Sequence, residues 1–202
     1  MFLEEIRLTN FRNYENLFLE FEPGLIFLTG ENGEGKTNLI EAIGFFSFLK
    51  SFRNIKEIEI IKWGEQFYHI SGIFKNKQQI KIEIGFEKEP VVRRKIKLNG
   101  NLIKKRSEII GETFSVIFSP SDLRIIEDGS IERRRYIDNF ISMSDRYYLE
   151  TLQEYNKVLK QRNALLKQKN YIENQIKVWD EQLIIKGIEI KEIREKQIKI
   201  LK

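Results

Sequence analysis

The sequence predicts an α/β protein in which a β-rich part with an antiparallel meander is followed by a helical hairpin. Three patterns support this prediction: a glycine-rich loop between an apolar run and a helical pattern (residues 25–43), alternating apolar and charged residues (80–98), and an apolar repeat of helical period (152–200). All three prolines and ten of the twelve glycines precede residue 121. Tight turns therefore belong to the first part of the chain and long helices to the second.

The N-terminal segment is predicted to form strands. Residues 2–8 and 17–21 have strand-like composition and are expected to pair with each other. Residues 25–29 and 114–118 are short, continuous apolar runs, a pattern typical of strands that are buried on both faces. The glycine-rich loop that follows the first of these runs leads into a helix beginning at 38–43.

An antiparallel meander is predicted after this helix. Apolar residues alternate with polar ones at 80–86 and again at 92–98, which is the period of a half-buried strand. The second run ends at Asn99-Gly100, a strong hairpin signal because both residues tolerate positive φ angles. His69 lies between apolar neighbours in another strand-like run, where we expect it to be packed or hydrogen-bonded.

Residues 145–202 are predicted to form two long helices. This stretch has no proline and one glycine, and six of the eight heptad positions in Ile176–Ile200 are apolar. We expect a helical hairpin or coiled-coil arm that turns near Lys169-Asn170, and we expect Ser130 and Ser144 to cap the helices that follow them. Two helices packed back on the first part of the chain are the alternative.

Composition excludes several classes of protein. The 202 residues include 35 Lys and Arg against 30 Asp and Glu, a formal charge of +5, and 15 Phe among 41% hydrophobic residues, enough for a folded core. The absence of cysteine excludes a disulfide scaffold and a thiolate metal site. The sequence has no signal-peptide core and no run of transmembrane length, so we expect a cytoplasmic protein without membrane contact. Residues 145–202 hold 13 basic and 9 acidic side chains, so most of the net charge belongs to the helical part.

The strongest motif is a phosphate loop. Eight consecutive residues match the pattern G-x-x-x-x-G-K-[ST]: Gly30, Glu31, Asn32, Gly33, Glu34, Gly35, Lys36 and Thr37. In such loops the glycines let successive backbone N–H groups converge on phosphates at a helix N-terminus. We expect Lys36 to reach the β- and γ-phosphates and the Thr37 hydroxyl to bind Mg²⁺. ATP is the expected nucleotide by default, because the sequence lacks the Asn-Lys-x-Asp motif of guanine-binding proteins.

Parts of a complete hydrolytic site are missing from the sequence. Hydrolysis needs an acidic residue, normally at the end of a buried strand, and the nearest candidate, Asp122, comes after Pro120. A Leu-Ser-Gly-Gly-type segment, which would contact ATP across a dimer, is missing as well. Three classes therefore stay open: an ATP-driven switch, a small-molecule P-loop phosphotransferase, and an SMC-like structural head whose arm tethers partners. We expect the 202-residue chain alone to hydrolyse little ATP.

Several longer motifs occur together in one order and spacing. They are Leu8–Tyr14, Gly30–Ile43, Lys50–Arg53, Phe118–Leu123, Arg133–Asp138 and Gln161–Leu166. With these motifs the chain closely resembles the RecF family of bacterial recombinational repair, over essentially all of its length. Ser130 is a departure, because the family usually has proline just before the arginine cluster.

The resemblance implies an ABC-type ATPase head of the SMC/Rad50-like kind, which dimerises around two ATP molecules. It also implies DNA binding, to duplexes and to junctions of single and double strands, with RecR as protein partner and with RecO in loading RecA at gaps. The family's signature motif and Walker B acid lie beyond residue 202. The resemblance therefore divides the chain into part of an ATPase head, residues 1–143, and a truncated helical arm, residues 144–202.

The resemblance also assigns site residues. Nucleotide contacts carry over to Arg12, Asn13, the loop 30–37 and Asn38. Asp122 matches a motif where relatives place a switch loop, which gives it a weak catalytic assignment.

Two basic clusters are predicted to contact DNA, because phosphate contacts use such residues. They are Arg93, Arg94 and Lys95 in the meander, and Lys104, Lys105 and Arg106 after it. A solvated surface is the alternative, since neighbours on a strand point to opposite faces. The basic helical arm is a second candidate for the DNA-binding surface. For the cluster Arg133–Arg135, a structural salt-bridge role is expected at least as much as a contact with DNA.

Overall fold

The computed structural model describes all residues except 54, 77, 106–107, 124–128, 168–172 and 201–202. The chain forms two compact units, a first unit of residues 1–118 and a second unit of residues 119–202. The boundary that we expect between residues 143 and 144 falls inside this second unit. The assignment of residues 1–143 to the family's ATPase head and of 144–202 to its helical arm stays a prediction. Within the described ranges, no helix combines the length and the apolar character needed to cross a membrane.

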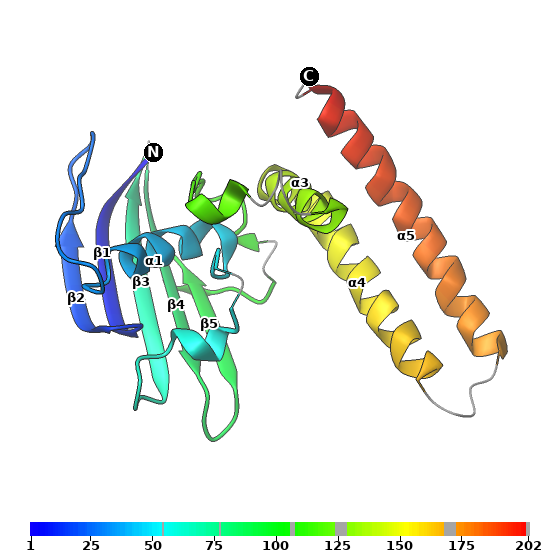
Figure 1. The fold of residues 1–202 in the computed structure, drawn as a ribbon, viewed down its shortest axis with the longest axis horizontal. Coiled ribbons are helices and arrows are strands. Elements are labelled where there is room, and N and C mark those ends of the chain that lie inside the picture. Colours follow the sequence, from blue (N-terminus) through cyan, green and yellow to red (C-terminus); the bar gives the residue numbers. More distant parts are fainter. Residues whose placement is uncertain (54, 77, 106–107, 124–128, 168–172, 201–202) are drawn as a thin grey trace. The chain divides into compact units, whose positions relative to one another are not determined.

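The first unit is a six-stranded antiparallel sheet with a helix across one face (Figure 1). The strands lie in the order β2-β1-β3-β4-β5-β6, and their bounds are β1 Phe2–Phe11, β2 Tyr14–Glu20, β3 Phe67–Lys75, β4 Gln79–Glu87, β5 Arg93–Leu98 and β6 Asn101–Leu102. The helix is α1, Lys36–Phe48, and a short 3₁₀ helix, η1, covers Glu57–Ile60. Each strand pairs with its neighbour in an antiparallel register.

Alternation explains how the sheet packs against α1. On β4, Ile82 and Ile84 are fully buried, while Lys81, between Ile80 and Ile82, is exposed. Gly72 on β3 permits the close approach of the helix, because a Cβ at this position would lie 2.8 Å from Cζ of Phe46 on α1. The core on this face therefore consists of aliphatic and aromatic strand residues, such as Ile84 and Tyr68, beneath aromatic residues of the helix such as Phe45.

The sequence predictions for the sheet are largely confirmed. Strands occur at 2–8, 17–20, 80–86 and 93–98, as expected, and form the predicted meander. Asn99 and Gly100 both have positive φ angles, 50° and 83°, as a two-residue hairpin turn of this kind requires.

Two predictions for the first unit are wrong. Residues 25–29 and 114–118 form no strand, and Leu25, Phe27 and Val116 are 81%, 78% and 98% exposed. A strand needs a hydrogen-bonding neighbour for its backbone, and in the described part of the chain no strand lies beside either run. The apolar composition of these runs indicates buried strands but gives no information about which strands could pair with them.

The second unit contains three long helices. They are α3 (Ser130–Ser144), α4 (Arg146–Leu166) and α5 (Glu173–Ile200), preceded by the 3₁₀ helix η3 (Pro120–Leu123). Polar pairs join α4 and α5, among them Tyr147 with Glu189, Glu154 with Lys186, and Arg162 with Asp180. Residue numbers fall along α5 as they rise along α4, so the two helices are antiparallel. This confirms the predicted helical hairpin, whose expected turn at Lys169-Asn170 lies outside the described residues.

The heptad register predicted for α5 is consistent with its burial. Ile176 and Ile190 are buried, whereas Ile184 and Ile185, which lie off the predicted seam, are more than half exposed. The predicted N-caps are wrong, because α3 begins at Ser130 itself and ends at Ser144.

Asp145 is the residue that caps α4. Its carboxylate accepts a hydrogen bond from the amide of Tyr148 at 2.9 Å, and its negative charge suits a helix N-terminus.

One polar cluster, which we call the Asp138 cluster, joins the three helices: Asp138 of α3, Tyr148 of α4 and Arg194 of α5. Arg194 donates from Nε and Nη2 to the two carboxylate oxygens, at 2.8 and 2.9 Å, and the Tyr148 hydroxyl donates to Oδ1 at 2.5 Å. Burial, and then the hydrogen bond to Asp138, raise the pKa of Tyr148. The hydroxyl therefore stays a donor to the carboxylate.

Candidate nucleotide-binding site

The phosphate loop runs from Gly30 to Thr37 and ends in the first turn of α1. Gly30, Gly33 and Gly35 have φ angles of 139°, 94° and 102°, a region that other residues rarely adopt. Gly35 is the N-cap of α1, which begins at Lys36. The predicted order of glycine-rich loop followed by helix is therefore confirmed.

Several backbone donors of this loop are free. Among the described residues, no hydrogen bond is found for the amide N–H groups of Gly33, Gly35, Lys36 and Thr37. These groups stand at the N-terminus of a 13-residue helix, where the helix dipole favours negative charge. The arrangement can bind an oxyanion such as a phosphate group.

Two charged side chains fold into the loop. Lys36 Nζ donates to the carbonyl oxygens of Gly30 and Glu31, at 2.7 and 2.5 Å. The Glu34 carboxylate accepts the amide of Glu31 at 2.9 Å, and a Cβ on Gly30 would meet Glu34 Oε2 at 2.0 Å. Lys36 thus lies at the loop as predicted, while Glu34 places a negative charge there that would compete with phosphate.

Asn13 brings the β1–β2 turn against the loop. Its Nδ2 donates to the carbonyl of Glu34 at 3.0 Å, and its Oδ1 accepts from Asn38 Nδ2 at 2.8 Å. A Cβ on Gly35 would lie 2.5 Å from Asn13 Nδ2, so the side chain rests directly on that glycine. Two residues predicted to bind nucleotide, Asn13 and Asn38, therefore meet each other and the loop.

Arg12, the residue beside Asn13, is held by a second polar group, which we call the Glu41 cluster: Arg12, Glu41, Ser51 and Arg53. Arg12 donates from Nε and Nη2 to the two oxygens of Glu41, at 2.9 and 2.8 Å, and from Nη1 to the carbonyl of Glu59 at 2.9 Å. The Ser51 hydroxyl also donates to Glu41, and Arg53 Nη1 lies 3.8 Å from it. The Glu41 side chain is fully buried, so these partners compensate its charge.

Thr37 is the predicted metal ligand of the loop. It is exposed in the first turn of α1, and no hydrogen-bond partner of its hydroxyl is found among the described residues. The same residues contain no group of three or more His, Asp or Glu that could hold a metal ion by themselves. A Mg²⁺ ion at this loop would therefore take the Thr37 hydroxyl, phosphate oxygens and waters as ligands, a common arrangement for this ion.

Asp122 lies in the second unit, in η3. Its Oδ2 accepts hydrogen bonds from the amide and the hydroxyl of Ser119, at 2.6 and 3.0 Å. This pattern is a local cap of a short helix. The catalytic assignment of Asp122 stays a prediction.

The predicted DNA cluster on β5 is split between the two faces of the strand. Arg94 points inward: Nη2 donates to the carbonyl of Leu49 at 2.8 Å, Nε lies 3.2 Å from Glu57, and the guanidinium covers the Phe45 ring. Arg93 and Lys95 are exposed. The structure therefore corrects the cluster by removing Arg94 from the solvent face.

The other basic residues and the histidine named in the sequence analysis differ in exposure and in their contacts. Lys104 and Lys105 are exposed after β6, and Arg106 lies outside the described residues. His69 Nε2 lies 3.9 Å from Glu83, and burial lowers the pKa of the imidazole. Arg135 pairs with Glu132 within α3 at 2.9 Å, in line with a structural role.

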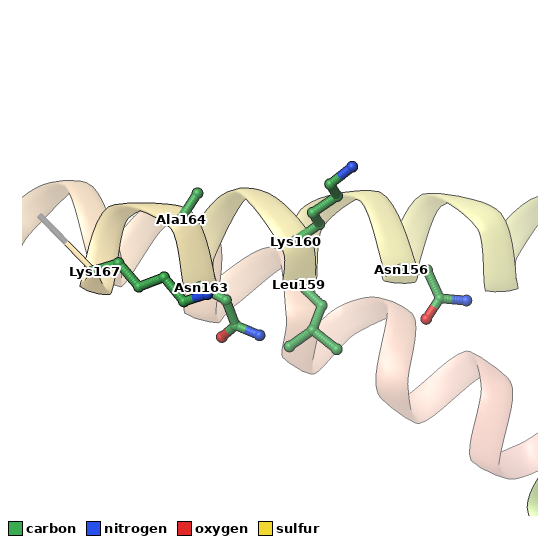
Figure 2. A pocket seen from close by; sticks show the side chains of 6 residues that line it. All are labelled: Asn156, Leu159, Lys160, Asn163, Ala164 and Lys167. Atoms are coloured by element: carbon green, nitrogen blue, oxygen red, sulfur yellow. The ribbon is translucent and has the colours of Figure 1, made fainter.

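A hollow on the second unit is lined by residues of α4 and by Lys167, the residue that follows this helix (Figure 2). Its lining consists of Asn156, Leu159, Lys160, Asn163, Ala164 and Lys167. Leu159 points toward the neighbouring helix and Lys160 away from it. The polar groups of the lining are two lysines and two asparagines, without a carboxylate or an imidazole.

The sequence analysis missed the Glu41 cluster as a group. A signal was present, because Glu41 lies between Leu39 and Ala42 on the apolar face of a predicted helix, and a buried carboxylate needs partners. The identity of those partners, Arg12 and Ser51, depends on the fold.

Comparison with known proteins gives a consistent result. The AAA domain family matches residues 5–202. The DNA replication and repair protein RecF of Leptospira interrogans is 48% identical over 189 residues, which is 93% of this chain and 52% of that protein. A solved structure of "the recombination mediator protein RecF-ATP in RecFOR pathway" is 38% identical with a TM-score of 0.89, over 98% of this chain and 54% of that one.

The fold is also shared with SMC ATPases. A structure from work on "ATP-driven dimerization and DNA stimulated activation of SMC ATPases" has a TM-score of 0.54 at 21% identity, over 69% of this chain and 99% of that one. The fold is therefore the α/β ATPase head with an antiparallel meander and a helical hairpin. The chain spans about half the length of the curated relatives that it matches. On the family match, the sequence identity and the shared fold together, the chain belongs to the AAA domain family and, within it, to the RecF proteins.

Proposed function

We propose that the protein binds ATP and Mg²⁺ through residues 30–38, and that in the whole protein ATP drives dimerisation and DNA binding during recombinational repair. The observation that carries the proposal is the set of free amides around Lys36 at the N-terminus of α1. The similarity to a RecF-ATP structure supports an adenine nucleotide. Partnership with RecR, cooperation with RecO in RecA loading, and a cytoplasmic location follow from membership of the RecF proteins and are part of the proposal.

Substitution of the loop lysine tests the nucleotide site. Lys36→Ala in the full protein is expected to lower ATP affinity at least about tenfold, because it removes a charge-assisted contact to phosphate. Lys75→Ala, which removes an exposed lysine of β3 that pairs with Glu4, is the matched control and is expected to bind ATP normally. Equal ATP affinities of the two variants, measured by calorimetry, would overturn the assignment of the loop.

Hydrolysis is assigned to the whole protein. The 202-residue chain contains neither the signature motif nor the Walker B acid of the family, so we expect it to release phosphate from ATP negligibly. Robust turnover by the purified 202-residue chain would show that an acid within it, with Asp122 as first candidate, completes the site.

For DNA binding we propose the exposed side of β5. Arg93, Lys95 and Lys97 alternate along this strand and are all exposed, and no ion pair of these three side chains is found among the described residues. Across the β4–β5 pair, Arg93 and Lys97 face glutamates, whereas Lys95 faces Gly85. Lys95 therefore has the least competition from carboxylates for a DNA phosphate. Lys104 and Lys105 extend the same proposal, as does Arg106.

Charge reversal separates this strand from the helical arm. Lys95→Glu is expected to weaken DNA binding by the full protein and to reduce the slope of log affinity against log salt by about one. Lys191→Glu on α5, which pairs with Glu195 within the helix, is the matched variant on the arm. If DNA affinity falls with Lys191→Glu and not with Lys95→Glu, the DNA-binding surface lies on the helical arm.

The other two function classes have less support. A small-molecule phosphotransferase needs an acceptor pocket at the phosphate loop, and the RecF and SMC similarities favour an ATPase head. A purely structural head would bind ATP without DNA. Retained ATP affinity together with no ATP-dependent DNA binding in the full protein would support that reading.

A further inference from the structure

We infer that Asn13 is a positioning residue that fixes the shape of the phosphate loop and so acts on bound phosphate through the loop backbone. The inference rests on the proposed nucleotide binding. It differs from a direct contact between Asn13 and the nucleotide, because the groups that Asn13 touches belong to the loop and to α1.

The contact with Glu34 is the central one. Asn13 Nδ2 holds the Glu34 carbonyl at 3.0 Å, and that carbonyl shares a planar peptide unit with the amide N–H of Gly35. In a trans peptide the carbonyl and the N–H point in opposite directions. Holding the carbonyl toward Asn13 therefore directs the Gly35 N–H, one of the free donors of the loop, to the opposite side.

The second and third contacts keep the Asn13 amide in one orientation. Oδ1 accepts from Asn38 Nδ2 at 2.8 Å, so one end of the amide is tied to α1 and the other to the loop. Gly35 leaves room for this amide, since a Cβ there would lie 2.5 Å from Nδ2 and 2.6 Å from Oδ1. Gly35 is thus required by its φ angle of 102° and also by Asn13.

The turn that presents Asn13 is itself anchored. Arg12 has a φ angle of 57°, its amide donates to the carbonyl of Ile60 at 2.7 Å, and its guanidinium holds both oxygens of the buried Glu41. Glu41 is one turn of α1 beyond Asn38. Asn13 is therefore fixed relative to the helix whose N-terminus forms the anion site.

Asn13→Ala in the full protein tests the inference, with two phosphate ligands as probes. We expect the affinities for ATP and for tripolyphosphate, which has no base or ribose, to fall by the same factor of about five to ten. Asn16→Ala is the matched control, because Asn16 lies on the same hairpin and contacts Thr9 instead of the loop. Its affinities should equal those of the parent protein.

Two further measurements separate positioning from direct contact. Without nucleotide, the Gly35 amide resonance and its hydrogen exchange should change in Asn13→Ala and not in Asn16→Ala. The double variant with Asn38→Ala should bind ATP about as well as Asn13→Ala alone, because both residues act through one contact. Should Asn13→Ala fail to fold, Asn13→Leu, which has a similar size and neither the donor nor the acceptor, gives the same tests.

The outcomes are distinct. Unchanged affinities in the Asn13 variant, or lost ATP affinity with intact tripolyphosphate affinity and an unchanged Gly35 amide, would overturn the inference. Absence of ATP and tripolyphosphate binding in the parent protein would instead refute the proposed function.

Discussion

Each of the two units contains a carboxylate that accepts hydrogen bonds from an arginine through both of its oxygens. The same carboxylate also accepts a hydrogen bond from a hydroxyl group. The Glu41 cluster of the first unit and the Asp138 cluster of the second therefore have the same chemistry, but their burial differs. The Glu41 side chain is 0% exposed and the Asp138 side chain 18% exposed. Water can partly replace a lost partner of Asp138 but not of Glu41.

The clusters also differ in what they join. The Glu41 cluster ties together the β1–β2 turn, α1 and the segment 51–53, which surround the phosphate loop. The Asp138 cluster joins three helices, and its side-chain hydrogen bonds among the described residues connect only Asp138, Tyr148 and Arg194 with one another. The same polar motif thus supports a binding loop in one unit and helix packing in the other, so its effects on binding and on stability are measured separately.

Removing the buried carboxylate should have the largest effect. Glu41→Ala leaves the Arg12 guanidinium without its partner in a buried setting, and we expect a loss of about 3–5 kcal/mol in the free energy of unfolding. We also expect ATP affinity to fall, because Asn13 loses its anchored turn. Urea unfolding and calorimetry measure the two effects. A loss below about 1 kcal/mol, as for ordinary surface ion pairs, would show that burial does not make the Glu41 cluster different from the Asp138 cluster.

The second carboxylate should matter less for stability and not at all for nucleotide. Asp138→Ala is expected to cost about 1–3 kcal/mol, because Arg194 and Tyr148 lose a partner but remain within reach of water. ATP affinity measured on the folded variant should be unchanged. A clear loss of ATP affinity would show that the two clusters are coupled.

The hydroxyl groups of Ser51 and Tyr148, one in each cluster, should show a smaller difference in stability of the same kind. Ser51→Ala and Tyr148→Phe each remove one hydrogen bond to a carboxylate, worth about 1.5 kcal/mol. Each also removes a bond that the hydroxyl accepts, from the Arg53 amide and from Arg194 Nε respectively. We expect Ser51→Ala to cost more than Tyr148→Phe, since the carboxylate that it leaves is fully buried. Unfolding in urea ranks the two variants, and the reverse order would indicate that burial is not what separates the clusters.

The smallest expected effect is on the pH dependence of the free energy of unfolding, in which the Tyr148 and Ser51 hydroxyls should differ. The pKa of Tyr148 is raised above its usual value of about 10 by burial and by Asp138, so the folded state favours the protonated phenol. The resulting stabilisation is complete below about pH 10 and is lost as the pH rises beyond it. Tyr148→Phe should reduce the loss of stability above pH 10, whereas Ser51→Ala should not. Part of the loss should persist in both, because the pKa of Tyr68 is raised too.

Local patterns in the sequence predicted the parts of the structure that depend on local pairing. The alternation at 80–86, the Asn99-Gly100 turn and the glycine-rich loop each specify a backbone conformation from neighbouring residues, and each is confirmed. The helical hairpin follows from the heptad positions in the same way.

The errors concern properties that depend on distant residues. The runs at 25–29 and 114–118 have the composition of buried strands, but pairing partners decide whether a strand forms. Arg94 reads as one member of a basic cluster, yet strand alternation and its contacts with Leu49 and Glu57 turn it inward. Glu41 was overlooked because its arginine is 29 residues away in sequence.

The exposed run at 25–29 affects how the chain behaves in solution. Leu25, Ile26 and Phe27 belong to a segment with high β propensity, no charge and no proline, and all three are exposed. Such segments pair readily with copies of themselves. Solutions of the 202-residue chain should therefore aggregate as concentration rises, and mild detergent should delay the onset by covering the apolar side chains.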